Sequence, residues 1–276
     1  MNAAELLTLL GQAWARLLLF PAGLTALLLL WLIELRRAPL PSAEPRRPFA
    51  ETLTAVVAPW LALALLPLPL LANLSRGTDA LLLLVLFEWP RWLAAASDIH
   101  YGDAAAQQRG VARLAALLNT APVVIFAVLL LVAVHGTLET RNLLRLPPDA
   151  GSIDQLRFWG GAIGLTLALP GMLEVGAFAL GRTTDPLLRV GLYLRSFGLL
   201  LLTALPWMSL LRDANGPIAW LLPLPPLLLL LLVWGADRAG RSHTALQWAR
   251  GYSALAALLL IGVLLSAAAA LQQRLQ

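Results

Sequence analysis

The chain has 276 residues, of which 59% are hydrophobic and 13% are charged, and it contains no cysteine. This balance excludes a soluble globular domain and indicates a membrane protein with several spans. The missing cysteines exclude disulfides, thiolate-bound metals and cysteine-ligated iron–sulfur clusters within the chain, so any such redox centre must belong to a partner.

The basic residues are all arginine, 20 in number, and leucine and alanine dominate the rest of the chain. This composition is typical of a GC-rich bacterial gene. The net charge of +5 does not predict nucleic-acid binding, because the arginines lie in short loops between apolar runs, where they set the topology of a membrane protein. We therefore expect no nucleic-acid partner and a location in the bacterial inner (cytoplasmic) membrane.

Apolar runs recur along the whole chain, and a transmembrane helix needs roughly 20 apolar residues. The sequence predicts an all-α bundle of about eight transmembrane helices in a single polytopic membrane domain, residues 1–276. The N-terminus lacks the features of a cleaved signal peptide, so the first run is expected to remain as an anchor. The predicted spans are Trp14–Ile33, Thr52–Leu74, Ala80–Ala95, Leu114–Val134, Phe158–Leu180, Ser196–Leu211, Ile218–Trp234 and Gly251–Leu271.

The distribution of arginines predicts the orientation of these spans. The loops after the first, third, fifth and seventh spans hold thirteen of the 20 arginines, and the opposite side holds seven. Cytoplasmic loops are enriched in arginine and lysine, so the thirteen are expected to be cytoplasmic. Both termini then lie on the non-cytoplasmic side.

Glu174 lies inside the fifth predicted span, a few residues after the Pro170-Gly171 break. A charged side chain near the centre of a transmembrane helix costs about 2.5–3.5 kcal/mol on insertion scales, so it usually faces other protein or a wet cavity. Two interpretations stay open. Glu174 belongs to a proton or substrate path, or it forms a structural ion pair with Arg182 or Arg113.

Two further acids lie near predicted span ends. Glu88 precedes Trp89-Pro90-Arg91 in the third span, and Glu34 ends the first span ahead of Arg36 and Arg37. A carboxylate near the interface is easily solvated, so these positions favour ordinary interfacial acids over functional ones.

The segment after the third span brings Asp98, His100 and Asp103 together. Such short alternating spacing is weak evidence for a metal site, and a solvated loop is the favoured interpretation. The sequence has no glycine-rich phosphate loop, nucleophile elbow or zinc-binding helix motif. We therefore expect the chain not to catalyse a reaction by itself.

Several local motifs follow one another in a familiar order. An acid and basic residues close the first span (Glu34 to Arg37), Ala58-Pro59 opens the second, Gly110-Val111-Ala112-Arg113 leads into the fourth, and Glu174 closes the fifth. In these features the chain resembles the membrane subunit 1 family of respiratory complex I, the NADH-quinone oxidoreductase, and its counterparts in group 4 membrane-bound hydrogenases and formate hydrogenlyase. It looks like a diverged member, because Asn119-Thr120-Ala121 stands where the family has an acid.

This resemblance implies a non-catalytic membrane-arm subunit of a multi-subunit oxidoreductase that links electron transfer to ion translocation. Antiporter-like subunits and a peripheral arm with iron–sulfur clusters would be its partners, and a quinone would bind at a shared interface, with no cofactor held by this chain alone. Spans two to six would form a half-channel-like bundle. The resemblance assigns four residues to the buried charge or proton path: Glu174, Glu88, Arg113 and Glu34. It assigns four others to the cytoplasmic loop that contacts the peripheral arm: Arg182, Asp185, Arg189 and Arg195.

A different class of function stays open beside this one. The chain would then be a stand-alone multi-span transporter or membrane scaffold, with Glu174 in a substrate pathway. An intramembrane enzyme acting on lipid is disfavoured, because no span carries paired catalytic polar groups.

Overall fold

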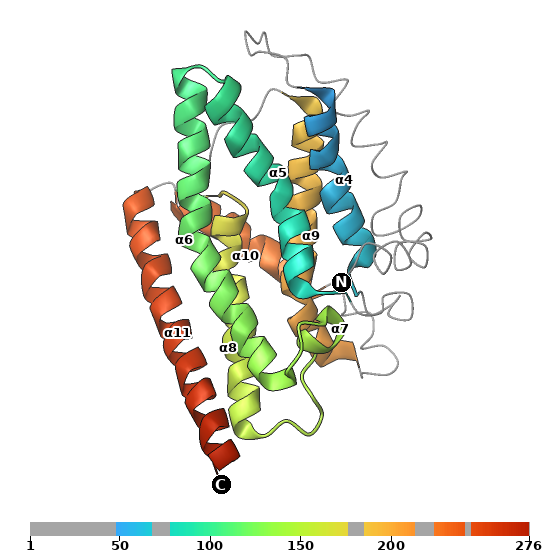
Figure 1. The fold of residues 1–276 in the computed structure, drawn as a ribbon, viewed down its shortest axis with the longest axis vertical. Coiled ribbons are helices and arrows are strands. Elements are labelled where there is room, and N and C mark those ends of the chain that lie inside the picture. The colour runs from blue at the N-terminus through green and yellow to red at the C-terminus, as the bar shows by residue number, and fades with distance from the viewer. Residues whose placement is uncertain (1–47, 68–77, 176–184, 213–223, 241–243, 276) are drawn as a thin grey trace. The chain divides into compact units, whose positions relative to one another are not determined.

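The computed structural model describes residues 48–67, 78–175, 185–212, 224–240 and 244–275, and within them every regular element is an α-helix (Figure 1). The first predicted span and both chain ends lie outside the described residues, so the count of eight and the side of the termini stay predictions. The helices are α4 (Phe49–Leu65), α5 (Ala80–Tyr101), α6 (Ala104–His135), α7 (Thr140–Leu143), α8 (Ser152–Met172), α9 (Pro186–Arg212), α10 (Leu224–Gly240) and α11 (Ala245–Leu275).

Several helices extend well past the apolar runs that predict them. The helix α5 continues to Tyr101 where the prediction ended at Ala95, while α6 and α9 each begin ten residues earlier than predicted. The predicted boundaries were wrong there because hydropathy marks the part of a helix that suits hydrocarbon, whereas backbone hydrogen bonds and caps decide where the helix ends. The start of α5 at Ala80 agrees with the prediction, and there the Asp79 carboxylate accepts a hydrogen bond from the N–H of Leu81, 2.7 Å away, and caps the helix.

Among the described helices, α5, α6, α9 and α11 are long and apolar enough to cross a membrane, and α4 is a shorter apolar helix of 17 residues. With 32 residues α6 is about 48 Å long. The hydrocarbon core of a bilayer is about 30 Å thick, so part of α6 must extend beyond it.

The chain separates into two compact units. One comprises Met1–Leu114 and Leu180–Leu199, and the other Ala115–Ala179 and Leu200–Gln276, so both α6 and α9 pass from the first unit into the second. In the first unit α4 lies beside α5 (Figure 1), and Ala55, Ala94 and Leu188 form a fully buried cluster that joins α4, α5 and α9.

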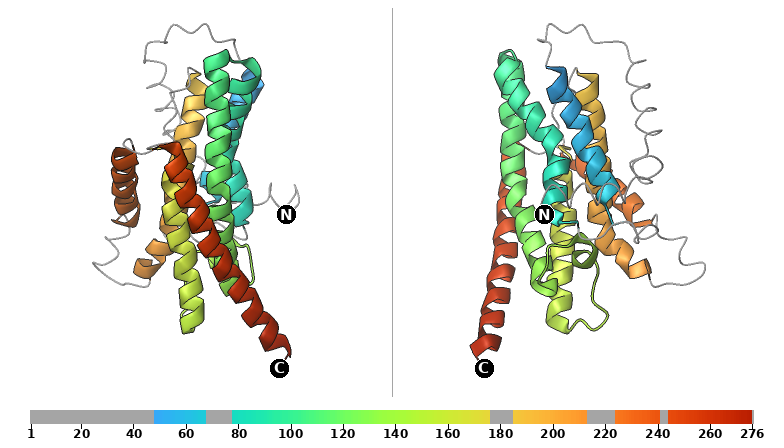
Figure 2. Two further views of the ribbon diagram at one scale, coloured as in Figure 1. Left: turned by 90° about the vertical axis from the view of Figure 1, so that its left-hand side faces the viewer. Right: turned by 45° about the vertical axis from the view of Figure 1, so that its right-hand side comes forward.

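In the second unit α8 packs against α11 (Figure 2) and α10, and its small residues lie at the closest contacts. A Cβ on Gly161 would stand 2.7 Å from the Ala127 carbonyl of α6, and one on Gly164 would stand 3.0 Å from the Leu259 side chain of α11. Close approach of helices through small residues is typical of membrane bundles, where packing rather than water drives association.

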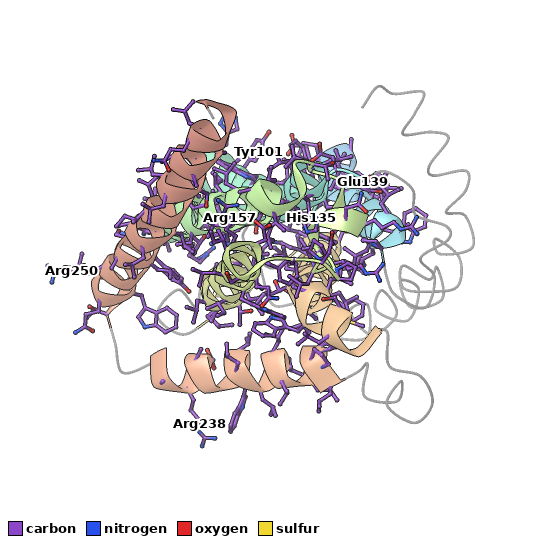
Figure 3. All side chains as sticks on the ribbon, turned by 90° about the horizontal axis from the view of Figure 1, so that it is seen from below. Tyr101, His135, Glu139, Arg157, Arg238 and Arg250 are labelled. Carbon is purple, nitrogen blue, oxygen red and sulfur yellow. The ribbon has the colours of Figure 1, made fainter. Side chains whose placement is uncertain are left out.

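Two arginines, Arg238 near the end of α10 and Arg250 near the start of α11, point away from their helices (Figure 3). Figure 3 shows Arg238 on α10 and Arg250 on α11 directed outward, and both side chains are exposed. The Arg238 guanidinium lies over the Trp234 ring, 5.0 Å from its centroid. A guanidinium stacked on an indole is typical of the membrane–water boundary, where the guanidinium is hydrated and the amphipathic indole lies at the level of the lipid headgroups.

Candidate functional site: a buried row of charges

One face of α5 carries three charged residues in the first unit of the fold. Glu88, Arg91 and Asp98 are spaced by three and seven residues, which places them within an arc of about 80° around the helix. Along the axis the row covers about 15 Å. Arg91 is 1% exposed, Asp98 is 3% exposed and the Glu88 side chain is 17% exposed. These charges therefore lie inside the protein.

Glu88 is held by two arginines. The Nη2 atom of Arg195 on α9 lies 2.8 Å from Oε1 and 2.9 Å from Oε2 of Glu88, and Nη1 of Arg91 lies 3.6 Å from Oε2. Arg195 itself is 2% exposed. A charge-assisted contact to both carboxylate oxygens fixes the position of the carboxylate as well as compensating its charge.

Glycines on α9 allow this contact. Gly191 and Gly198 lie one turn before and one turn after Arg195 on the same helix face. A Cβ on Gly191 would collide with the Ala55 backbone of α4, and one on Gly198 would collide with the Phe87 ring of α5. The missing side chains therefore bring α9 close enough for Arg195 to reach Glu88.

The second ion pair joins α5 to α6. Nη1 of Arg113 lies 2.7 Å from Oδ2 of Asp98, and both side chains are buried. Gly110, one turn before Arg113, lies against α5, since a Cβ there would stand 2.8 Å from the Ala95 carbonyl and 2.7 Å from the Ile99 side chain. The Gly110-x-x-Arg113 motif is thus a close helix crossing that places a guanidinium opposite Asp98.

We call Glu88, Arg91, Asp98, Arg113 and Arg195 the ionic row. Burying an ion pair costs about as much desolvation energy as the two charges gain from each other, so such pairs add little to stability. They do fix geometry, because breaking one leaves a buried charge uncompensated. An arrangement with little benefit to stability but high positional precision is typical of charged residues that serve a function within membranes.

The remaining predicted residues lie elsewhere. Glu174 follows the C-terminal end of α8 in the second unit, half-buried. Asp185 caps α9, where its carboxylate accepts hydrogen bonds from the N–H groups of Leu187 and Leu188 at 2.9 and 3.1 Å. Arg189 is half-buried in the first turns of α9. Glu34 and Arg182 lie outside the described residues.

Four positions differ from the sequence-based expectation. Glu174 lies two residues beyond the end of α8 at Met172, not inside a helix as the fifth predicted span had it. Glu88 is the ninth residue of a 22-residue helix and lies near its middle, not near its end, because α5 continues to Tyr101. Arg195 belongs to α9 and is buried against Glu88, so it is not a loop residue that faces a partner. Asp98 is helical and buried, not part of a solvated loop, because Arg113 compensates its charge.

Sequence reasoning missed Arg91, and it interpreted Asp98 as part of a solvated loop, with a metal site as the weaker alternative. The available signal was their helical spacing from Glu88, which the early predicted end of the third span concealed. The metal-site interpretation of Asp98 with His100 and Asp103 finds no support in this geometry, since His100 and Asp103 are exposed while Asp98 is buried. Within the described ranges no three potential metal ligands gather.

This fold is shared with a chain of known structure. No family model matches the sequence, and no characterised protein matches it at a significant level. A chain in the structure of the membrane-bound sulfane sulfur reductase, an archaeal respiratory membrane complex, matches with a TM-score of 0.67 and 17% sequence identity, covering 94% of this chain and 99% of that one. At this identity the match establishes the fold, and assignment to subunit 1 in particular stays a prediction.

Proposed function

We propose that this multi-pass membrane protein is a membrane-arm subunit of a complex I-like or group 4 hydrogenase-like assembly. In this role it anchors a peripheral redox arm and links electron transfer to the movement of ions, most simply protons, across the membrane. The observation that carries the proposal is the ionic row, four buried charged side chains and the partly buried Glu88 on three helices, in a fold shared with a chain of a respiratory membrane complex.

The position of the row along α5 supports a role in ion movement. Glu88 lies about 12 Å along a helix that is about 33 Å long. A lone charge at such a depth costs several kcal/mol, and ionisable residues placed there usually mark an ion or proton pathway. Guanidinium groups stay protonated in proteins, so the arginines shape the electric potential. The carboxylates of Glu88 and Asp98 are the groups that can exchange a proton.

The proposed role requires partners on the cytoplasmic side and within the membrane. The arginine-rich side of the protein would face the cytoplasm and contact the peripheral arm, with Arg182, Asp185 and Arg189 near that contact. Antiporter-like subunits would lie beside this chain in the membrane. We further propose that a quinone binds at an interface shared with a partner and that partners hold iron–sulfur clusters. No described residue of this chain is assigned to either group.

Substitution of Glu88 by Gln in the assembled complex tests the proposal. The change removes the charge and keeps the size of the side chain. We expect electron transfer to continue while ion translocation per electron falls about tenfold, because the neutral amide can neither exchange a proton nor balance Arg195. The measurement compares electron transfer with ion uptake in membrane vesicles that contain the complex.

Glu51 of α4 provides the matched control, since it is an acid in the first turn of a helix and outside the row. Glu51→Gln should leave both activities unchanged. Glu88→Asp keeps the negative charge. If Glu88→Gln fails to assemble because Arg91 and Arg195 have lost the charge that compensates them, Glu88→Asp should still assemble. An assembled Glu88→Gln complex that moves ions at the normal ratio would disprove a role for the row. Solute transport by the purified chain alone in liposomes would instead favour a stand-alone transporter.

A further inference from the structure

The C-terminal end of α8 has an unusual turn. Glu174 has a φ angle of 54°, and it is the one non-glycine residue with positive φ among those described. Its N–H donates to the Gly171 carbonyl at 3.3 Å, and the N–H of Val175 donates to the Pro170 carbonyl at 3.1 Å. These two bonds are those of a Schellman motif, in which glycine usually occupies the left-handed position.

Glutamate is a costly residue at this position. A left-handed backbone is disfavoured for residues with a Cβ, whereas glycine adopts it without strain. The same turn would therefore form more readily with glycine. A residue kept in an unfavourable conformation points to a function for its side chain. The backbone of this turn sets the direction in which the Cα–Cβ bond of Glu174 leaves the end of α8.

Tyr252 of α11 holds the turn from the side. The N–H of Gly171 donates to the Tyr252 hydroxyl at 2.9 Å, and Tyr252 is 5% exposed. Gly171 thus donates to Tyr252 and accepts from Glu174, so two hydrogen bonds connect the phenol to the backbone of Glu174. Trp248, one turn earlier on α11, packs against the Tyr252 ring with 6.1 Å between centroids.

The absence of a side chain at Gly171 makes this contact possible. A Cβ on Gly171 would collide with the Thr120 side chain of α6 and stand 2.9 Å from the Tyr252 hydroxyl. Thr120 is buried, and its hydroxyl donates within α6 to the carbonyls of Ala116 and Leu117. Three helices of the second unit therefore meet at Gly171, one turn before Glu174.

We propose that Tyr252 is a positioning residue for Glu174: its hydroxyl anchors the last turn of α8 and thereby fixes the direction of the Glu174 carboxylate in the ion path. This inference rests on the proposed function and on the place of Glu174 in the charge path that the resemblance implies. It adds a residue of α11 that acts on the path through Glu174, which the sequence alone did not indicate. The phenol itself takes no part in ion transfer in this scheme.

The test combines Tyr252→Phe and Glu174→Gln, singly and together, in the assembled complex. Tyr252→Phe keeps the ring and removes the acceptor, so we expect ion translocation per electron to fall about threefold to tenfold, the effect of losing one buried hydrogen bond. Glu174→Gln should lower it further, and the double variant should match Glu174→Gln alone, because the two residues act in one step. Tyr101→Phe, at an exposed position on α5, is the control.

Hydrogen exchange supplies a readout that does not depend on ion transfer. The amides at the end of α8 should exchange faster in Tyr252→Phe than in the parent chain. If exchange is unchanged, or if Tyr252→Phe lowers translocation equally in the Glu174→Gln background, the positioning role is wrong. If Glu174→Gln itself has no effect, Glu174 is not in the ion path and the role that the resemblance implies for it fails, whereas the proposed role of Glu88 is unaffected. A normal ion ratio in Tyr252→Phe, with a reduced ratio in Glu174→Gln, overturns the positioning role alone.

Discussion

Single residues decide whether the charges in this membrane bundle are tolerated. Asp98 and Arg113 are both buried and lie 2.7 Å apart, so each compensates the charge of the other. The sequence could not predict this pair from hydropathy, because the apolar run ends before Asp98. It did place Arg113 in the Gly-x-x-Arg motif, and the structure shows that Gly110 provides the space this motif needs.

Breaking the pair on one side should destabilise the protein strongly. Asp98→Asn leaves the Arg113 guanidinium buried without its carboxylate, and loss of one partner of a buried ion pair typically costs about 3–5 kcal/mol, so we expect a decrease of that size in the free energy of unfolding. The double variant Asp98→Asn with Arg113→Met removes both charges and should recover most of the loss. Chemical denaturation in detergent measures the stability of both variants. Equal instability of the single and double variants would show that charge compensation is not the reason for the pair.

Individual helices were easier to predict than their ends. Every predicted span that falls on described residues contains a helix, because long apolar runs are a strong signal. The ends were less accurate, since α5, α6 and α9 extend into polar sequence, and this error displaced Glu88 toward the interface. The packing role of Gly191 and Gly198 could have been suspected from their spacing around Arg195. The partner of that arginine could not, because Glu88 is 107 residues away.

The close contact between α9 and α5 should be sensitive to added side-chain volume. Gly198→Ala places a methyl group against the Phe87 ring, and overpacking of a close contact costs about 1–3 kcal/mol, so we expect a lower thermal midpoint and a weakened Glu88–Arg195 contact. Gly235→Ala in α10 is the control, because a Cβ there would meet nothing within 4 Å. Alanine has the higher helix propensity, so Gly235→Ala should be neutral or slightly stabilising. Comparable midpoints for the two variants would argue against the close approach of α9 to α5.

At the scale of the whole molecule, composition and hydropathy were enough to predict an all-α multi-pass protein, and the resemblance to respiratory membrane subunits is supported at the level of fold. The division into two units, with α6 and α9 contributing to both, was not predicted. Such a division depends on contacts between distant segments, which apolar periodicity does not report. Orientation in the membrane, in contrast, depends on a property that the sequence does carry, the distribution of arginine.

The orientation can be tested directly because the chain has no cysteine of its own. Gln108, on the arginine-rich side near Arg109, and Asp149, in the segment between α6 and α8, are both exposed. If arginines are retained on the cytoplasmic side, a membrane-impermeant maleimide added to right-side-out vesicles should label Asp149→Cys at once and Gln108→Cys only after permeabilisation. The parent chain should give no signal in either condition. The reverse pattern would place the arginine-rich side outside the cell, and the peripheral redox arm could then not dock on it from the cytoplasm.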